Sequence, residues 1–590
     1  MLRRRRYWCS RSKPHKDLAK PAKELFIGVQ RIQGRLVTAR KLKAIDLYSG
    51  VGGWSLGLRL AGIDVVASYE LWGPANETNF KNNSHQAQTV DIRRLSLEDL
   101  PKGIDIVVGS PPCTQFSFSN RGGGGDIADG LQDIIRFLNI VDRLKPRLWA
   151  MENVPRVAKI IEMELRSGGA LAEFAHLGCA THIVDMAEYG LPQRRRRCIA
   201  GNFDVDLLQS YREKAKMRTL GDVITALAND CVDDPLFGIT MPRAEVTDHV
   251  EEDILSTEEV RINCANKMTH TVYNAMPFPD PLHRSVRTIT ATCTRVSRES
   301  IVIATQDRPD AFRRLTLRER ASLQGFPITF QFYGANYSQK LRMIGNAVPP
   351  AFAYLMGHAL QDHAANEVLS LDQAGKYLKR PVPLPVETAP DRVGAKYPSD
   401  RTFRFAIPSL QLKSGVRFEL CNDRSGDVVI WRMAFYFGTS KAIHAVALDE
   451  ALAQDLAHGM SAALSAVVKT ALDDVKRFIA TADIPNMQAV WAHRGPGGTR
   501  AFMVLDKLDQ VGAALVDVLS KYDGEARLLV EKAIINEHGS KAEKLPGLAK
   551  LARNATTILA GLLIGSAVNP LFDGHAHRSP ASRKPAFGMG

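Results

Sequence analysis

A cysteine stands where a nucleophile could act. The apolar run Asp105–Gly109 leads into Ser110-Pro111-Pro112-Cys113. Two prolines stiffen this turn, and open parallel sheets bind ligands beyond the carboxyl ends of their strands. A thiol held there near amides and cations can have its pKa lowered enough to attack a substrate. A lone cysteine usually packs as a small apolar residue, but the stiff turn and the glycine-rich segment 118–126, a predicted lid, favour the nucleophile.

An acid and a basic run follow at later strand ends. Glu152 follows the apolar run Leu148–Met151, and if burial raises its pKa it could donate a proton to a ring nitrogen. The alternative is an acid that starts a helix. The run Gln193–Arg197 leads into an apolar strand, and because strand side chains alternate, Arg195 and Arg197 share one face. We expect that face to point into the crevice, although basic runs are usually solvated or bind phosphates.

A glycine-rich turn points to a nucleotide-like ligand. The strand Lys43–Leu47 ends in Tyr48-Ser49-Gly50-Val51-Gly52-Gly53, ahead of a predicted helix over 54–61. Glycines let the backbone approach a ligand, and the GxGG spacing disfavours a nicotinamide dinucleotide. Glu70 ends the next apolar run, where a carboxylate can bind a ribose diol, and Asp91 could meet an adenine amino group. The set predicts an adenosyl-type cofactor; a tight turn without a ligand is the alternative.

The elements that must position these residues follow an α/β pattern between residues 43 and 363. Short apolar runs alternate with amphipathic stretches, which is typical of βαβ units. The predicted strands are 43–47, 65–69, 104–109, 148–151 and 198–200. Each strand end carries one of the groups above or a turn residue. The sequence therefore predicts that the thiol, the acid and the glycine turn lie at one edge of a sheet.

Length, net charge, cysteine spacing and apolar runs limit the class of protein and its partners. The chain has 590 residues, enough for about two to four domains, and a net charge of +14, which favours nucleic acid over an anionic membrane as partner. Its eight cysteines include no CxxC pair, so neither disulfides nor a metal site are expected. The apolar run Ile558–Val568 is too short to span a bilayer and predicts a buried helix. No apolar run follows the N-terminal arginines, so we expect a soluble, cytoplasmic protein.

The rest of the chain divides by composition. Residues 1–42 form a basic arm, 366–400 a Pro-rich linker and 573–590 a tail. Between them, 401–572 predict a separate α+β domain with strands at 402–407, 416–420 and 428–437 and helices around 448–480, 505–522 and 528–536. This domain carries no chemical motif. A structural or protein-interaction role is the leading interpretation, and additional DNA binding is the second.

The ordered motifs resemble those of the DNA cytosine-5 methyltransferase family. Besides the runs above, Arg314–Arg320 with Leu323–Pro327 resembles the family's ninth motif, and Gly345–Pro350 resembles the tenth. The resemblance covers residues 43–363. It implies a fold of the S-adenosylmethionine-dependent methyltransferases, with a doubly wound, mostly parallel sheet. Residues 43–203 would form the catalytic core, 204–285 a small target-recognition region and 286–365 the end of the catalytic domain.

The resemblance also implies roles for single residues. Cys113 would attack carbon 6 of cytosine, Glu152 would protonate nitrogen 3, and Arg195 and Arg197 would steady the base and the thiolate. The carbonyl of Pro111 would meet the amino group. The residues expected at the S-adenosylmethionine site are Tyr48, Gly50, Val51, Gly53, Glu70, Asp91, Pro112 and Asn346. The family pattern is broken at Thr114, which stands in place of a glutamine, and at Leu71, which stands in place of an aromatic residue that Trp72 could replace.

The function expected from the resemblance is methylation of carbon 5 of a flipped-out cytosine in a specific double-stranded DNA sequence. A monomer on DNA in the bacterial cytoplasm, near the nucleoid, is expected. Its setting would be a bacterial or phage restriction–modification system, with a cognate restriction endonuclease as partner, or that of an orphan methylase. A tRNA cytosine-5 methyltransferase and a catalytically silent DNA-binding homologue are the alternatives. The candidate contacts to bases or phosphates in the recognition region are Arg261, Lys267, His270 and Arg284.

Overall fold

The computed structural model describes residues 29–32, 35–38, 40–116, 125–268, 275–392, 402–412, 416–425, 428–439, 442–490, 498–539, 551–574 and 577–578. Most of the predicted basic arm, most of the predicted lid, His270 and most of the tail lie outside these residues. The strands β1 (Val29–Ile32) and β2 (Arg35–Thr38) pair as an antiparallel hairpin ahead of the first sheet.

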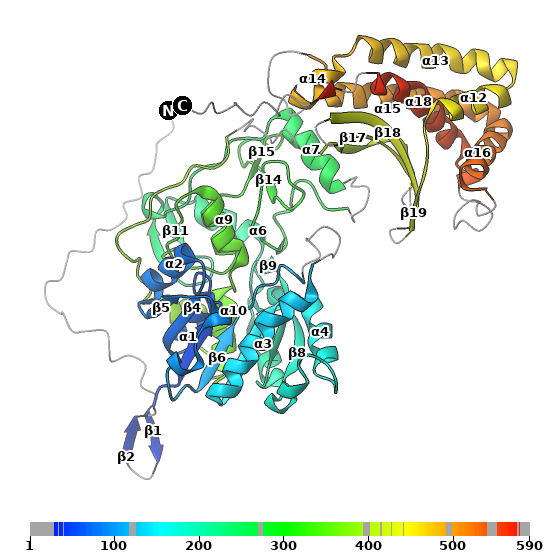
Figure 1. Ribbon diagram of the computed structural model, residues 1–590. Coiled ribbons are helices and arrows are strands. Elements are labelled where there is room, and N and C mark those ends of the chain that lie inside the picture. The colour runs from blue at the N-terminus through cyan, green and yellow to red at the C-terminus, as the bar shows by residue number, and fades with distance from the viewer. Residues whose placement is uncertain are drawn as a thin grey trace, which may run out of the picture.

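A seven-stranded sheet forms the lower part of the molecule in Figure 1, in the order β5-β4-β3-β6-β7-β10-β8. The first five of these strands are parallel; β10 runs antiparallel to its neighbours β7 and β8, so β8 again has the direction of the first five. The strands are β3 (Lys43–Leu47), β4 (Asp64–Glu70), β5 (Gln86–Thr89), β6 (Ile106–Gly109), β7 (Leu148–Asn153), β8 (Ala180–Asp185) and β10 (Arg196–Gly201). All five predicted strands are present, with ends within two residues of those predicted.

Helices cover both faces of this sheet, which makes it the doubly wound fold that was predicted. The helices are α1 (Gly53–Leu60), α2 (Gly73–Asn83), α3 (Ile127–Leu144), α4 (Arg156–Glu164), α5 (Val205–Ser210) and α10 (Pro350–Ala359). Trp54 and Phe352 lie in the buried cluster on one face, and Phe137 and Trp149 lie in the cluster on the other. Because β6 is covered from both sides, its sequence is a continuous apolar run rather than an alternating one.

The region between β10 and α10 has its own small core. It contains α6 (Leu220–Ala228), β11 (Cys231–Asp233), β12 (Thr240–Pro242), α7 (Thr257–Met268), β13 (Val286–Arg287), β14 (Val302–Ala304), β15 (Phe312–Arg314), α8 (Leu317–Leu323) and α9 (Tyr337–Asn346). The two-residue strand β13 pairs in parallel with β9 (Gln193–Arg194). This pairing joins the segment that follows residues 204–285 to the residues just before β10 of the catalytic sheet.

The predicted Pro-rich linker is not free over residues 366–392. It contains the short helix α11 (Leu371–Gly375), and beyond it the chain is bonded to the catalytic part. Arg380 forms an ion pair with Glu245 at 2.8 Å, and the hydroxyl of Tyr333 donates to the carbonyl of Pro383 at 2.7 Å. Composition predicted the linker but not these contacts, because they join its backbone carbonyls and charged side chains to residues far away in the sequence.

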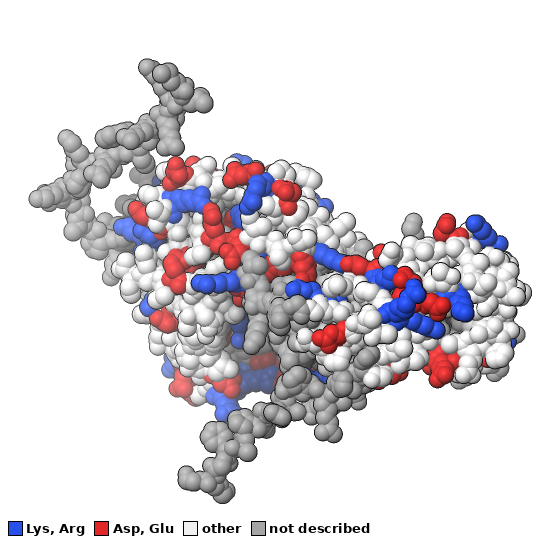
Figure 2. Space-filling view, turned by 90° about the horizontal axis from the view of Figure 1, so that it is seen from above, with Lys and Arg blue, Asp and Glu red and all other residues white. Residues whose placement is uncertain are grey.

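Charged side chains are interspersed on the surface. Figure 2 shows Lys and Arg mixed with Asp and Glu over the face seen from above. On this face the net charge of +14 is therefore not gathered into one basic patch.

Residues 402–578 form a second module, defined here as the C-terminal module, with an α+β composition as predicted. Its sheet contains β16 (Arg404–Gln411), β17 (Arg417–Ser425), β18 (Val428–Thr439), β19 (Ala442–Val446) and β20 (His577–Arg578). Its helices are α12 (Glu450–Gly459), α13 (Ala462–Thr481), α14 (Ile484–Val490), α15 (Ala501–Leu519), α16 (Asp523–His538) and α18 (Ala555–Asp573). The helix predicted over 448–480 is two helices, because Ser461 caps the start of α13.

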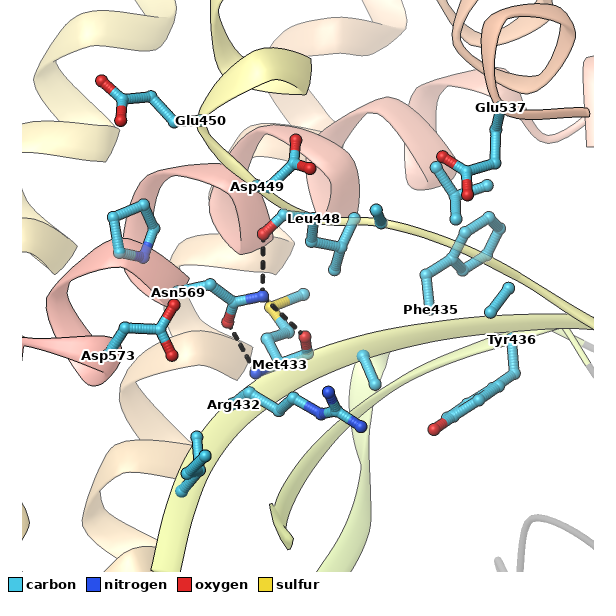
Figure 3. A pocket seen from close by; sticks show the side chains of 16 residues that line it. Arg432, Met433, Phe435, Tyr436, Leu448, Asp449, Glu450, Glu537, Asn569 and Asp573 are labelled. Atoms are coloured by element: carbon cyan, nitrogen blue, oxygen red, sulfur yellow. Dashed lines mark hydrogen bonds between the residues drawn. The ribbon is translucent and has the colours of Figure 1, made fainter. Parts of the chain in front are cut away.

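A hollow of about 780 Å³ lies beside β18 in the C-terminal module (Figure 3). At its floor the side chain of Asn569 of α18 hydrogen-bonds to backbone groups of this strand. Its side-chain amide donates to the carbonyls of Met433 and Leu448 and accepts from the backbone N–H of Met433, all at 2.8–2.9 Å. Asn569 thus ties the end of α18 to the sheet.

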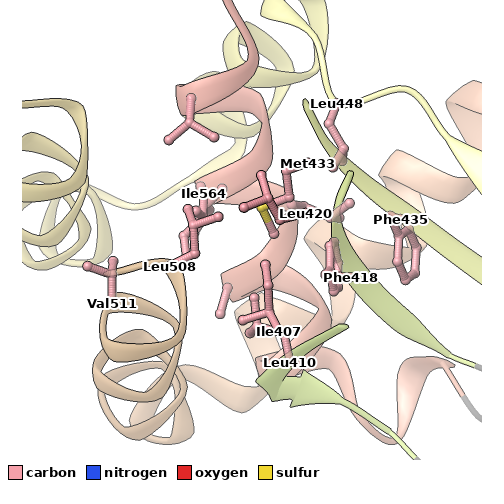
Figure 4. Close-up of a cluster of buried hydrophobic side chains, with 14 of the residues drawn as sticks. Ile407, Leu410, Phe418, Leu420, Met433, Phe435, Leu448, Leu508, Val511 and Ile564 are labelled. Carbon is pink, nitrogen blue, oxygen red and sulfur yellow. The ribbon is translucent and has the colours of Figure 1, made fainter. Parts of the chain in front are cut away.

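Helix α18 is the centre of the C-terminal module. It lies between α15 and one face of the sheet, where Ile564, Leu508 and Phe418 are among the buried contacts (Figure 4). A Cβ at Gly561 would lie 2.3 Å from the ring of Phe418, so glycine permits this close packing. Among the described residues α18 is the one helix long and apolar enough to cross a membrane, but 67% of its most apolar window is buried inside the module. It is the buried helix predicted from the run 558–568.

Candidate active site

The carboxyl ends of four parallel strands meet at one edge of the catalytic sheet. Leu47 at the end of β3 pairs with Tyr69 of β4 on one side and with Gly109 of β6 on the other, and Gly109 pairs with Met151 of β7. The residues that follow these positions are the glycine turn, Glu70, the Pro-Cys turn and Glu152. The register therefore places the predicted site residues at the same edge, as the sequence predicted.

Cys113 lies half-buried in the turn beyond β6. Burial raises the pKa of its thiol, and the negative charge of Glu152 raises it further, whereas the guanidinium groups of Arg197 and Arg195 lower it. All four groups thus lie within electrostatic reach of one another. The turn is fixed from below, because Asn153 donates through Nδ2 to the carbonyl of Pro111 at 3.1 Å. Sequence reading missed this contact, although Asn153 stands next to Glu152.

Glu152 lies within β7 and is not the start of a helix. Its side chain is almost completely buried, and Nε of Arg197 lies 2.9 Å from its Oε1 in an ion pair. The N–H does not point at this oxygen, which has no hydrogen-bond partner among the described residues. A buried carboxyl oxygen that lacks a hydrogen bond is costly unless a ligand supplies one. Glu152 can therefore bind a polar group that enters beside Cys113.

The arginine run alternates as predicted. Arg194 and Arg196 are exposed, Arg197 is half-buried and Arg195 is buried. Burial, together with the nearby charge of Arg197, lowers the pKa of Arg195 to about 9. Its guanidinium donates to the carbonyls of Ala347 at 3.1 Å, of Gly345 at 3.4 Å and of Ile289 at 3.5 Å. Arg195 thus holds the segment that resembles the tenth motif, and Arg197 is the arginine paired with Glu152.

The glycine turn leaves room for a ligand at one position. Gly50 has φ +52°, and a Cβ built there would meet no atom within 4 Å. Its N–H donates to Oε2 of Glu70 at 2.9 Å, and the N–H of Trp72 donates to Oε1 at 2.8 Å. Because a carboxylate can accept about four hydrogen bonds, Glu70 keeps capacity for hydroxyl groups while it braces the turn.

Other residues of the predicted cofactor set have different surroundings. Val51 is buried in the core, so its side chain does not line an open site. A Cβ at Gly53 would lie 1.9 Å from the carbonyl of Val348, so this glycine serves the contact between α1 and the segment before α10. Tyr48 is half-buried, and its hydroxyl contacts the Asp133 carboxylate at 3.2 Å. The side chains of Val51 and Tyr48 therefore make contacts within the fold.

The remaining members of the set are accessible. Asp91 is partly exposed and accepts from the N–H of Arg93 at 3.0 Å, which caps a short helical turn. Pro112 and Asn346 are exposed. Leu71 is 66% exposed, and Trp72 packs under the guanidinium of Arg342, which lies 4.7 Å from its ring centre.

A buried acid of the glycine strand was missed by sequence reading. Asp46 is inaccessible to solvent, and its Oδ2 accepts from the N–H and the hydroxyl of Ser55 at 3.2 and 2.7 Å. Burial raises its pKa to about 7, despite these hydrogen bonds. Its Oδ1 has no hydrogen-bond partner among the described residues. The signal in the sequence was a carboxyl inside an otherwise apolar strand.

Two of the candidate DNA-contacting residues, Lys267 and Arg261, already have partners within the protein. Lys267 is buried, donates to Oδ1 of Asn263 at 2.9 Å, and burial lowers its pKa to about 8. Arg261 is paired with Asp506 of the C-terminal module. Neither has the free charge that a phosphate contact requires. Arg284 is exposed and keeps that capacity.

The doubly wound sheet, with a thiol, a buried carboxyl and a guanidinium beside a glycine turn, defines an α/β enzyme of the methyltransferase class. Residues 42–362 match the model of the C-5 cytosine-specific DNA methylase family, and the chain belongs to this family. The protein is a DNA cytosine-5-methyltransferase.

Similar proteins match the same part of the chain. The type II methyltransferase M.NgoPII of Neisseria gonorrhoeae is 28% identical over 347 residues, which cover 55% of this chain and 96% of that protein. M.HindV of Haemophilus influenzae is 27% identical over 339 residues, which cover 56% and 100%. Among solved structures, the S. pombe Dnmt2 methyltransferase is 19% identical, with a TM-score of 0.38 over 55% of this chain and 99% of its own.

Proposed function

We propose that this chain transfers a methyl group from S-adenosylmethionine to carbon 5 of a flipped-out cytosine in a specific duplex sequence, through a covalent adduct with Cys113. The observation that supports this most directly is the position of Cys113 beside the Glu152–Arg197 ion pair, at the sheet edge that carries the glycine turn. The proposed reaction requires the thiol of Cys113 and the carboxyl of Glu152 to act on the same cytosine ring, and the two groups lie within electrostatic reach of one another.

Each residue type suits one step. Carbon 5 of cytosine is a poor nucleophile. When the Cys113 thiolate adds to carbon 6, a sulfur–carbon bond forms, and the electron pair of the ring double bond becomes available at carbon 5. A proton on nitrogen 3, supplied by Glu152, stabilises this electron-rich ring. Once carbon 5 carries the methyl group, loss of its proton, which we assign to water, restores the double bond and releases the thiolate, and the nitrogen 3 proton returns to Glu152.

The residues fit the proposed cofactor. S-adenosylmethionine, when bound, supplies the methyl group as an electrophile. The open space at Gly50 admits a ligand against the backbone, and Glu70 keeps acceptor capacity for ribose hydroxyls. Asp91 would bind the adenine, and Pro112 and Asn346 would border the methionine end. The half-buried and exposed positions of these three residues are consistent with that role.

The proposal extends to the biological setting. The relatives are named type II methyltransferases, which supports a role in restriction–modification with a cognate endonuclease. We propose that residues 204–285 read the DNA sequence and that the enzyme acts as a monomer in the cytoplasm, at the nucleoid. Arg284 is the exposed candidate for a phosphate contact.

Removal of the nucleophile tests the mechanism. Cys113→Ser should abolish methyl transfer to duplex DNA and should form no covalent complex with DNA that contains 5-fluorocytosine, because a serine hydroxyl is a far weaker nucleophile than a thiolate. Bisulfite sequencing reads the first effect and denaturing electrophoresis the second. Cys179→Ser, at another half-buried cysteine that lies outside the proposed recognition region, is the matched control and should keep both activities. A Cys113→Ser protein that still transfers methyl groups would refute the covalent mechanism.

A further inference from the structure

The C-terminal module contacts one helix of the recognition region. In Figure 1, α7 lies at the top of the catalytic part, next to α14 and β17 of the module. Ile262 of α7 is inaccessible to solvent and belongs to the same buried cluster as Phe502 and Leu505 of α15. Ala265, one turn further along α7, packs against this cluster. The core of the C-terminal module thus continues into the recognition region.

Polar contacts fix the same face of α7. Both Nη atoms of Arg261 donate to the Asp506 carboxylate, one of them at 2.9 Å, which is the bidentate geometry that orients a helix most strictly. The guanidinium of Arg261 also lies 4.4 Å from the ring centre of Phe502. One turn earlier, Glu258 pairs with Arg500 at 3.5 Å. Side chains three and four residues apart on a helix share a face, so these contacts form one continuous contact surface.

The opposite face of α7 is bonded to the catalytic side. Glu259 pairs with Arg295 at 2.7 Å, and Asn263 donates to the carbonyl of Arg295 at 2.8 Å. Arg295 in turn donates to the carbonyl of Ile254, within the recognition region. Helix α7 is therefore held between the C-terminal module on one face and the segment 293–298 on the other.

Helix α7 depends on these contacts for its position. It has 12 residues, and isolated helices of this length are marginal in water. Its buried residues include the polar Glu259, Asn263 and Lys267, so burial of an apolar stripe alone does not hold it. The module supplies a rigid partner, because α15 is itself packed between α18, α13 and β16.

We propose that the C-terminal module positions the target-recognition region through α7, with Arg261 and Asp506 as positioning residues for DNA binding. This rests on the proposed function, in which residues 204–285 read the sequence. The module then does not act on the methyl group. It fixes the angle at which the recognition region meets the duplex, and so sets affinity and sequence selectivity while leaving the chemical step unchanged.

A charge swap tests the proposal. In Arg261→Asp and in Asp506→Arg, like charges face one another across the contact, so the KM for duplex DNA should rise about five- to tenfold. The ratio of methylation at cognate to near-cognate sites should fall, and kcat at saturating DNA should stay within about twofold. The double variant Arg261→Asp/Asp506→Arg restores the opposite charges and should recover KM and selectivity. Arg527→Asp breaks an ion pair of similar exposure inside α16 and is the matched control.

Hydrogen exchange gives a readout that does not need activity. The amides of α7 should exchange faster in each single variant and regain protection in the double variant. If a reversal prevents folding, Arg261→Lys keeps the charge but loses the bidentate geometry and should give the same effects in weaker form. Single variants that fold and keep wild-type KM, selectivity and α7 protection would overturn the proposal. A wild-type protein that methylates no duplex DNA, while α7 exchange responds as expected, would instead refute the proposed function.

Discussion

At the scale of single residues, the site depends on how Glu152 and Cys113 influence each other. The negative charge of Glu152 helps to raise the pKa of the Cys113 thiol, although the same carboxyl is proposed to assist the reaction by donating a proton. Before substrate binds, burial first and Glu152 second thus favour the protonated thiol. Arg197 and Arg195 act in the opposite sense on the thiol.

This coupling predicts two opposite effects of Glu152→Gln. Methyl transfer should fall about 100-fold or more, because a proton donor to the ring is lost. The pKa of the Cys113 thiol should fall, because a negative charge beside it is removed.

Alkylation of Cys113 measures the second effect. The rate should rise with pH in the wild type, since the raised pKa of the Cys113 thiol moves thiolate formation to higher pH, and the whole profile should shift to lower pH in the variant. Iodoacetamide labelling of the Cys113 peptide, followed by mass spectrometry, gives the profile. Cys179, whose pKa is raised by burial with no contribution from Glu152, is the internal control. A variant whose alkylation profile matches the wild type would show that Glu152 does not act on the thiol.

At the scale of elements, the glycine turn separates two uses of glycine. Gly53 permits close packing, since a Cβ there would overlap the Val348 carbonyl. Gly50 faces open space and is required only for its positive φ and for any ligand that approaches it.

A matched pair of substitutions distinguishes backbone strain from ligand contact. Gly50 and Gly62 both have positive φ and open space around the missing Cβ, so alanine should cost about 1 kcal/mol of stability at either position. Only Gly50→Ala should weaken S-adenosylmethionine binding, by about tenfold or more, because its methyl group would enter the proposed site. Calorimetric titration and thermal unfolding measure the two quantities. Equal loss of cofactor affinity in both variants would place the cofactor elsewhere.

At the scale of the whole molecule, net charge predicts how the enzyme responds to salt. With a net charge of +14 we expect several phosphate contacts, although basic and acidic groups are mixed on the face in Figure 2. An enzyme with about six phosphate contacts loses about 10³-fold in DNA affinity between about 50 and 200 mM salt, through counterion release.

Cofactor affinity is the reference for that measurement, because a small ligand with a net charge of about +1 releases few counterions and its binding should change little over the same range. Fluorescence anisotropy with labelled duplex and titration with S-adenosylmethionine give the two slopes. A DNA affinity that is independent of salt would contradict a binding mode based on phosphates.

The sequence by itself determined the elements that carry the catalytic groups. Apolar runs and the turns after them placed Cys113, Glu152 and the glycine turn at strand ends, and the alternation of a strand separated Arg195 and Arg197 from Arg194 and Arg196. These are local properties, because side-chain direction follows from backbone period within a few residues.

Only the tertiary structure decided which long-range partner each side chain has. In the folded chain the guanidinium of Arg195 donates to the carbonyls of Gly345 and Ala347, and Lys267 is buried. Arg261 pairs with Asp506, which is 245 residues away in the sequence. The Pro-rich segment is held against the catalytic part by the hydrogen bond from the Tyr333 hydroxyl to the Pro383 carbonyl. Hydrogen bonds and ion pairs of this kind depend on which surfaces meet when the chain folds, and no periodicity in the sequence records that meeting.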